Sequence, residues 1–500
     1  TGAGAGAGGS GGSPGAEGGT PPAVVDTVAP AARFVTAPPA LLKYQALVIG
    51  FSEPMDTASL VLSGDLATAG SPSWTTSADT LTLSPGPGGW PRGAGQVIGL
   101  AARDRAGNAL APLSERFLVP LEFINHQPAV AVIGQPDFIS NGANQPVSSG
   151  RPTSGNLNNP VGNPWLSPEG RLVVPDTGNH RLMVFDAIAQ ANGATASAVI
   201  GQPDFFSNAR VVDAAHRISP RGIAAGAGRF VVSEFEADRV AIYDRSPVES
   251  PAVLPTVVLG ASDFTELSVS VGCNVFPWRL MRPTGVSVTP DGKLLVSDSG
   301  HNRVLIWNQM PTVSNQAPDV VLGQSGLTSC IANAPASSGG TPGLSNRSLS
   351  APVGLWTDGT RLVVVDAGNQ RALVWTSFPS SNFQPADLVL GQPDFSTSGA
   401  IDPRDAIVSS GNAGGSFLGE VTSNGEQLAI ADPYGSRVVL WNRFPTRNFQ
   451  PADRVLGRAP TTPTNTQVTQ DGTFLPMGLF MARDYLMVVN GNRVSVFKSN

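Results

Sequence analysis

The chain is poor in cysteine, histidine and lysine, and it has no long hydrophobic run. It has two cysteines, Cys273 and Cys330, and four histidines among 500 residues. Lysine stands only at positions 43, 293 and 498, so arginine carries nearly all the positive charge. A net charge of -6 without a basic cluster argues against a nucleic-acid partner. Because no apolar stretch reaches about 18 residues, we expect no transmembrane segment.

Glycine and proline are abundant instead, with 57 and 44 residues, and the apolar fraction is 41%. Both residues favour tight turns over long helices, and this apolar content can fill the cores of two or three domains. We therefore expect an all-β protein.

Residues 1–22 differ from the rest because they are rich in Gly, Ala and Ser, a composition typical of a flexible tether. The segment resembles the linker that follows the processed cysteine of a bacterial lipoprotein, which predicts a lipid anchor upstream of Thr1. An ordinary disordered leader is the alternative. The lipoprotein interpretation predicts an extracellular or outer-membrane surface location in a bacterium.

Residues 23–120 contain short alternating runs near 46–51, 80–83 and 95–100, separated by turn residues. This pattern is typical of a small β-sandwich. Phe51-Ser-Glu-Pro-Met-Asp56 and the turn Asp104–Leu110 resemble the bacterial Ig-like domains of surface proteins. Such domains are usually spacers, and we assign no site to this one.

Six related segments recur from residue 176 onward. In each full copy an acidic residue stands five positions before an arginine, and the arginine opens a short apolar run that ends in an aromatic residue. The copies are Asp176–Phe185, Glu234–Tyr243, Asp298–Trp307, Asp366–Trp375, Asp432–Trp441 and the shortened Asn490–Phe497. A repeat of this kind decides the fold before any single residue does.

Two further motifs interleave with the first. One is Val-Ile/Leu-Gly-Gln-Pro-Asp-Phe, complete or altered at 132–138, 199–205, 258–264, 321–327, 389–395 and 455–458. The other is a glycine at 162, 222, 285, 354, 419 and 478, preceded two residues earlier by proline except in the fifth copy, which has Phe417. Three motifs in six copies indicate six structural units of one kind.

One unit reads as four short strands joined by tight turns. In the third unit we expect strands at 285–288, 293–297, 303–307 and 320–323. Four strands in meander order are typical of a propeller blade, so the six units predict a six-bladed β-propeller over residues 124–500. The chain enters on a fourth-strand motif and leaves on a third-strand motif, so the first strand should pair with the last and close the ring.

The Asp-x-Gly-Asn-x-Arg turn, with its upstream Pro-x-Gly, resembles the NHL-repeat β-propellers over roughly residues 124–500. Two features depart from that pattern. Successive arginines are 58, 64, 68, 66 and 56 residues apart, longer than a compact blade needs, which predicts insertions. The copy that starts at Glu234 has no glycine in its turn.

We interpret the acidic residues and arginines of the repeat as structural. A carboxylate can accept turn amide hydrogens, while a guanidinium can bond backbone carbonyls and reach the neighbouring blade. Removing one partner of such a pair could cost roughly 3 kcal/mol. The residues are Asp176, Arg181, Glu234, Arg239, Asp298, Arg303, Asp366, Arg371, Asp432, Arg437 and Arg493. The repeated glycine should stand where innermost strands crowd the axis.

Cys273 and Cys330 lie in equivalent connections of adjacent units, which predicts a disulfide in an exported protein. Closing that loop would contribute roughly 4 kcal/mol on the chain-entropy model.

Few residues suggest chemistry. The histidines, at 126, 180, 216 and 301, lack metal-binding spacing. The irregular polar cluster around the second copy offers weak metal candidates, His216, Glu234, Glu236 and Asp238, although a solvated acidic turn explains it too. We assign no catalytic residue and no cofactor.

Three functions remain open. The leading hypothesis is a non-enzymatic cell-surface or secreted scaffold whose variable polar loops bind a protein or glycan. The second is a metal-dependent propeller enzyme, because the resemblance includes lyases and hydrolases with ligands at the central opening. The third is a structural part of an envelope assembly.

Overall fold

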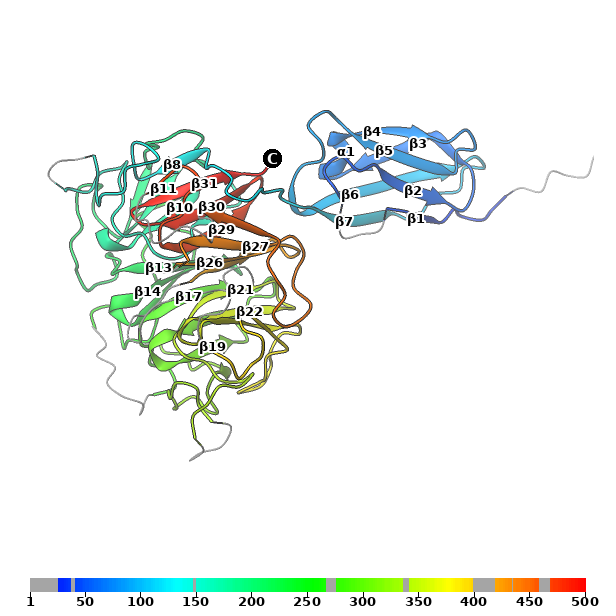
Figure 1. Ribbon diagram of the computed structural model, residues 1–500. Helices are drawn as coiled ribbons and strands as arrows, with labels where there is room; N and C mark the ends of the chain where they lie inside the picture. Colours follow the sequence, from blue (N-terminus) through cyan, green and yellow to red (C-terminus); the bar gives the residue numbers. More distant parts are fainter. Residues whose placement is uncertain are drawn as a thin grey trace, which may run out of the picture. The chain divides into compact units, whose positions relative to one another are not determined.

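The computed structural model describes residues 26–36, 41–146, 150–266, 276–335, 341–398, 419–433, 435–457 and 468–500. The predicted tether, residues 1–22, lies outside these ranges. The chain divides into two compact units, an N-terminal unit (Thr1–Trp90 and Val97–Phe117) and a C-terminal unit (Pro91–Gln96 and Leu118–Asn500). Both are built from antiparallel sheets, as the all-β prediction requires (Figure 1). None of the helices in the described ranges is long and apolar enough to cross a membrane.

The N-terminal unit contains a four-stranded and a three-stranded sheet. Phe34 and Phe117, one from each sheet, make an edge-to-face contact with ring centroids 5.4 Å apart, so apolar faces of the two sheets meet. Asp104 accepts hydrogen bonds from the backbone and side chain of Asn108, both at 2.8 Å, which closes the turn singled out in the sequence. The elements are β1 (Ala32–Phe34), β2 (Leu47–Phe51), β5 (Thr80–Pro85) and β4 (Gly70–Trp74) in one sheet, β3 (Met55–Ser63), β6 (Gly93–Asp104) and β7 (Leu113–Val119) in the other, and helix α1 (Asp65–Ala69).

The described part of the C-terminal unit contains six four-stranded sheets, here named I to VI, each with the meander order predicted for a blade. Sheet I comprises β9 (Trp165–Leu166), β10 (Leu172–Asp176), β11 (Arg181–Phe185) and β12 (Ala198–Ile200). Sheet II comprises β13 (Pro220–Gly226), β14 (Arg229–Glu234), β15 (Arg239–Tyr243) and β16 (Val257–Leu259). Sheet III comprises β17 (Pro283–Val288), β18 (Leu294–Asp298), β19 (Arg303–Trp307) and β20 (Val320–Leu322).

Sheet IV comprises β21 (Pro352–Thr357), β22 (Leu362–Asp366), β23 (Arg371–Trp375) and β24 (Leu388–Leu390). Sheet V comprises β25 (Val421–Ser423), β26 (Leu428–Asp432), β27 (Arg437–Trp441) and β28 (Arg454–Gly457). Sheet VI comprises β29 (Pro476–Ala482), β30 (Tyr485–Asn490), β31 (Arg493–Lys498) and β8 (Ala131–Ile133). Single 3-10 turns join second to third strands in the first four sheets: η1 (Thr177–Asn179), η2 (Phe235–Ala237), η3 (Ser299–His301) and η4 (Ala367–Asn369).

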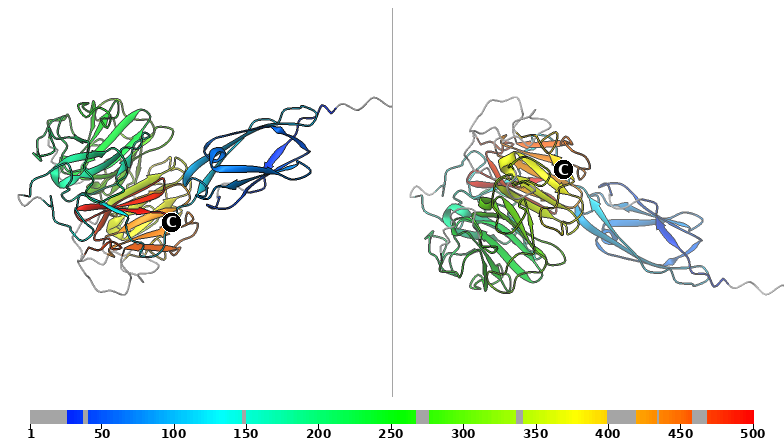
Figure 2. Two further views of the ribbon diagram at one scale, coloured as in Figure 1. Left: turned by 90° about the horizontal axis from the view of Figure 1, so that it is seen from above. Right: turned by 90° about the horizontal axis from the view of Figure 1, so that it is seen from below.

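Sheet VI joins the two ends of this unit. Strand β8 pairs antiparallel with β31, and Val132 stands opposite Ser495. The two segments, cyan and red in Figures 1 and 2, lie side by side. The predicted pairing of first and last strands is therefore confirmed. It removes one exposed strand edge from the sheet.

The continuous apolar strands are explained by burial of both faces of each sheet. Alternate residues of a strand point to opposite faces. Leu294 and Val296 lie in one buried cluster with sheet II, whereas Leu295 between them lies in another with sheet IV. Strands covered on both faces lose the polar alternation of a one-sided sheet.

The repeated glycines bring the innermost strands together. A methyl group on Gly222 or Gly285 would come within 3.0 Å of a backbone carbonyl in the next sheet, that of Thr284 or Val353. The same holds from Gly162 to Arg221 and from Gly478 to Gly162, whereas Gly419 meets the carbonyl of Ala431 in its own sheet. The sequence-based interpretation of this motif as a packing glycine is confirmed at these positions.

The acidic residue and arginine of each full copy are brought together as a buried pair. Arginine Nε donates to the carboxylate at 2.7–2.9 Å in all five. In the third copy the other oxygen of Asp298 accepts the backbone N–H of Met281 at 2.7 Å. The arginine Nη1 atoms donate to the carbonyl at the end of the Gly-Gln-Pro-Asp-Phe motif, as from Arg181 to Phe205 at 2.6 Å. Each pair therefore ties its turn to the connections on both sides.

The link to the next sheet comes from the residue before the arginine, to which the sequence analysis assigned no structural role. His180, Asp238 and Asn302 hold left-handed backbone there, with φ of 55°, 50° and 55°. This conformation is enriched in Asn, Asp and His. Their side chains accept the N–H of the residue before the next Pro-x-Gly, that of Ser219, Arg282 and Ala351 at 3.1, 2.7 and 2.9 Å. Asn492 does the same for Asn159 at 2.7 Å.

The sixth copy lacks the acidic partner. Asn490 stands opposite Arg493 in the β30–β31 register, where the other copies have a carboxylate. Arg493 Nε and Asn490 Nδ2 are buried without a hydrogen-bond partner. Burial lowers the pKa of Arg493 to about 10, opposed by Asp137. In this copy the arginine therefore lacks the paired carboxylate of the other five.

We expect Gly285→Ala to destabilise the C-terminal unit, because the new methyl group would overlap the carbonyl of Val353. Overpacking of this kind costs about 1–3 kcal/mol. Urea denaturation followed by tryptophan fluorescence measures the change. The control is Gly326→Ala, where an added methyl meets nothing within 4 Å. Equal stability of the two variants would contradict the crowding of the inner strands.

We expect Asn490→Asp to stabilise the protein, because it gives Arg493 the carboxylate that the other copies have. A hydrogen bond to a charged group contributes about 1.5 kcal/mol. Differential scanning calorimetry at neutral pH should show a higher Tm. The charge-matched control is Asn208→Asp at an exposed position. If both variants melt at the same temperature, Arg493 does not lack a partner in solution.

Candidate functional site

The four weak metal candidates are not gathered into one set of donors. Glu234 is fully buried, and its carboxylate is held by Arg239 at 2.8 Å and by Arg217. Among the described residues, none of these four belongs to a group of three or more acidic, histidine or cysteine side chains whose ligand atoms lie within 4.8 Å of one another. Glu234 is thus a longer substitute for the repeat aspartate that serves two arginines.

The other three candidates each have a different local partner. His216 Nδ1 lies 2.9 Å from an oxygen of Asp213. Glu236 pairs with Arg210 at 3.3 Å. Asp238 accepts the N–H that links sheets II and III. Their polar atoms are used within the turn and its neighbours.

His301 is a fully buried repeat residue. Its Nδ1 lies 2.8 Å from Asp298 Oδ2. Asn179 and Asn369 hold the same position in other copies and donate to their aspartates at 2.8 and 2.7 Å. His301 therefore replaces an asparagine as a donor to the turn carboxylate.

Cys330 is disulfide-bonded. Its predicted partner, Cys273, lies outside the described residues, so the pairing itself stays a prediction.

One acidic group in the N-terminal unit was not anticipated from the sequence. Oxygen atoms of Asp26, Glu53 and Asp104 lie within 4.8 Å of one another. Burial, then the charges of Asp26 and Asp104, raise the pKa of Glu53. Asn108 already occupies part of the Asp104 carboxylate, so the group offers few free oxygens to a cation.

The cavity that stands out in the C-terminal unit lies where the innermost strands of all six sheets meet. This axial pocket has a volume of about 200 Å³. In each sheet its lining begins one or two residues after the repeated glycine, which is the only feature the sequence offers for finding it. The lining residues are Asn163, Pro164, Trp165, Ile223, Ala224, Ala225, Val286, Ser287, Val288, Leu355, Trp356, Val421, Thr422, Ser423, Phe480 and Met481.

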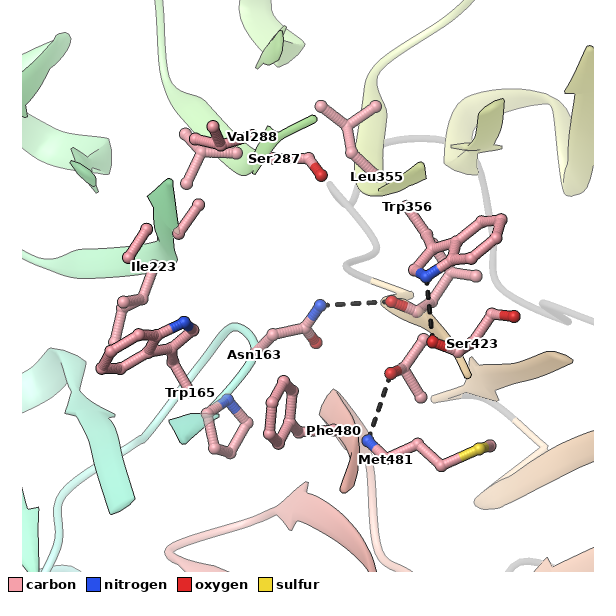
Figure 3. A pocket seen from close by; sticks show the side chains of 16 residues that line it. Asn163, Trp165, Ile223, Ser287, Val288, Leu355, Trp356, Ser423, Phe480 and Met481 are labelled. Carbon is pink, nitrogen blue, oxygen red and sulfur yellow. Dashed lines mark hydrogen bonds between the residues drawn. The ribbon is translucent and has the colours of Figure 1, made fainter. Parts of the chain in front are cut away.

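Aromatic rings and uncharged polar groups face this space. Figure 3 shows Trp165 and Trp356 on opposite sides, with Asn163 and Phe480 between them. Trp165 is braced by Phe230 at 5.5 Å, and Trp356 Nε1 donates to the carbonyl of Ser423 at 2.9 Å. The walls are therefore held by their own contacts.

Asn163 ties three sheets together at the pocket. Its Nδ2 donates to the carbonyl of Val421 in sheet V at 3.2 Å, and its Oδ1 accepts the N–H of Leu479 in sheet VI at 2.8 Å. Thr422 Oγ1 accepts the N–H of Met481 at 3.2 Å. Ser287 Oγ turns toward the open space in Figure 3. The lining contains no Asp, Glu, His, Cys, Lys or Arg.

A family model for the NHL repeat matches residues 280–307, which cover β17, β18, η3 and β19. No curated protein matches the chain. Among solved structures, a streptogramin B lyase is 10% identical, covering 89% of this chain and 99% of its own, with a TM-score of 0.35. The calcium-binding protein regucalcin from Agrobacterium tumefaciens is 12% identical, covering 74% and 97%, with a TM-score of 0.34.

A structure of the nidogen/laminin complex is 14% identical, covering 65% of this chain and 96% of its own, with a TM-score of 0.35. These neighbours include enzymes and binding proteins, and none of their activities is transferred to this chain. The NHL match and the four-stranded meanders show that the C-terminal unit is a β-propeller containing an NHL repeat.

Proposed function

We propose that this protein is a non-enzymatic binding protein that holds a glycan in the axial pocket of a six-bladed propeller. The sequence placed the binding surface on the connecting loops, but long parts of these loops lie outside the described residues. The axial pocket carries the proposal instead. Six blades are supported by the six sheets, the β8–β31 pairing and the close approach of repeated glycines to neighbouring sheets.

The chemistry of the lining matches a sugar. A sugar ring presents apolar C–H faces and a rim of hydroxyl groups. The pocket offers the aromatic rings of Trp165, Trp356 and Phe480, together with Ser287 and the other polar residues of its lining. Sites for small molecules combine aromatic walls with a few placed polar groups. An apolar cavity of about 150 Å³ holds benzene, so about 200 Å³ takes one six-membered ring with substituents.

An enzyme at the same place is less well supported. General acid–base catalysis and metal binding use ionisable side chains, and the pocket lining has none. The uncharged walls favour reversible binding of a neutral ligand over a metal-dependent lyase or hydrolase.

We further propose an Ig-like spacer for the N-terminal unit and an extracellular location. The two packed sheets and the Asp104 turn support the spacer. The disulfide at Cys330 supports export, because disulfides persist in oxidising compartments. The lipid anchor upstream of Thr1 remains part of this proposal, and N-terminal mass spectrometry of the native protein tests it.

We expect a neutral glycan from an array to bind the intact chain, and Trp165→Ala to weaken it at least tenfold, or about 1.4 kcal/mol. Ser287→Met should abolish binding by filling the pocket while leaving Tm nearly unchanged. Isothermal titration calorimetry measures both. The control is Trp278→Ala, because Trp278 stacks on Phe276 and does not line the pocket.

Unchanged affinity in both pocket variants would place the glycan elsewhere. A neutral-glycan array without any hit would remove the proposed ligand class. Melting curves of each variant separate a lost ligand contact from a lost fold.

A further inference from the structure

A second group of side chains lies at the axis, next to two of the repeated glycines. Arg221 directly precedes Gly222 in sheet II, and Glu420 directly follows Gly419 in sheet V. In a circle that runs from sheet I to sheet VI, these two sheets face each other across the axis. Each charge acts on the pKa of the other, yet the two side chains make no ion pair or hydrogen bond. The axial pocket does not include either residue.

Arg221 is a partly buried cation whose guanidinium group has buried donor atoms without partners. Its guanidinium carbon lies 3.2 Å from the ring centre of Phe235. Nε and Nη1 are buried without a hydrogen-bond partner. Burial lowers the pKa of Arg221 to about 9, and Arg282 adds to this, while Glu420 and Glu236 oppose it.

A second guanidinium stands near the same ring. The Arg282 guanidinium carbon is 5.9 Å from the ring centre of Phe235. Its backbone is fixed by the 2.7 Å hydrogen bond to Asp238. Glu236 in the same turn is engaged with Arg210, so it leaves the two axial arginines without a dedicated counter-charge.

Glu420 adds a donor rather than a counter-ion. Only 3% of the residue is exposed, and its carboxyl group has no hydrogen-bond partner among the described residues. Burial raises the pKa of Glu420 to about 8, opposed by Arg221. At neutral pH the carboxyl group is therefore mostly protonated and carries an O–H donor.

Buried donors without partners cost folding free energy, and such local departures from good packing are expected at functional sites. We propose that this end of the axis is a binding site for the carboxylate group of a small acid. A single negative charge matches the guanidinium of Arg221, with Arg282 adding attraction, and charge-assisted hydrogen bonds of this kind are short and strong. The protonated carboxyl group of Glu420 donates an O–H hydrogen bond to the same carboxylate.

A carboxylate fits this site better than a phosphate group. Arg221 lies against the Phe235 ring, whereas Arg282 is farther away and exposed to solvent. Only one desolvated guanidinium is therefore available, and a second negative charge would have to be desolvated without a partner. The inference does not depend on the glycan pocket, since no residue is shared.

The test is calorimetric titration of the intact chain with sodium acetate at constant ionic strength and neutral pH. We expect saturable binding by the wild type and at least a tenfold higher Kd for Arg221→Gln. Arg229→Gln, which alters an arginine paired with Asp244 at the β13–β14 hairpin, the end of β13 away from Arg221, should bind acetate as the wild type does. Arg221→Gln should fold, because Glu420 is already neutral without it.

A second variant tests the role of Glu420 without removing the cation. In the wild type, acetate affinity should fall as the pH rises through about 8, because ionised Glu420 repels the ligand. Glu420→Gln keeps a neutral donor and should lose this pH dependence while still binding at neutral pH. Arg221 is the charged group that faces Glu420, so titration is kept below about pH 9, where Arg221 itself begins to lose its proton.

Three results would overturn the inference. These are no acetate binding by the wild type, equal binding by wild type and Arg221→Gln, or tighter binding of inorganic phosphate than of acetate. Failure of the neutral-glycan array leaves these outcomes unchanged, so the two proposals fail separately.

Discussion

The buried pair of carboxylate and guanidinium in each turn is the interaction on which the arrangement of the sheets depends. Arg303 binds Asp298 through Nε, and its other nitrogens donate to the carbonyls of Arg279 and Leu327. Desolvation offsets much of the attraction within such a pair, so its main effect is geometric. It fixes where the connections enter and leave each sheet, and the close approach of the glycines at the axis requires that placement.

The β-propeller was predictable because a few residue types make the same contacts to backbone groups in several copies of the repeat. Only glycine fits beside the next carbonyl at Gly285, and only arginine reaches three acceptors at Arg303, so these residues recur and reveal the strand order. The sheet-to-sheet acceptor was missed because any short polar side chain serves there. His180, Asp238 and Asn302 make the same hydrogen bond with three different chemical groups, and a pattern search for one residue type finds none.

The copies that depart from the repeat show how the ring tolerates substitution. Glu234 replaces an aspartate with a longer acid, and Arg217 fills the additional space and binds its second oxygen. In the sixth copy no such compensation exists, and Arg493 keeps a buried nitrogen without a partner. The irregular sequence of the second copy therefore has a structural reason. Its acidic residues suggested a metal site, but the structure does not bring them together around one point.

Both proposed sites lie where the six copies differ, and this follows from symmetry. A residue that every sheet needs must be the same in every sheet. The residues at the repeated positions therefore have structural roles. The axis is different, because one ligand there meets all six sheets at once and needs different groups from each. The residues that follow equivalent glycines differ from sheet to sheet, as Ser287 and Trp356 do, and Arg221 faces Glu420 rather than another arginine. Neither group could be found from a motif, since each exists only after the ring has closed.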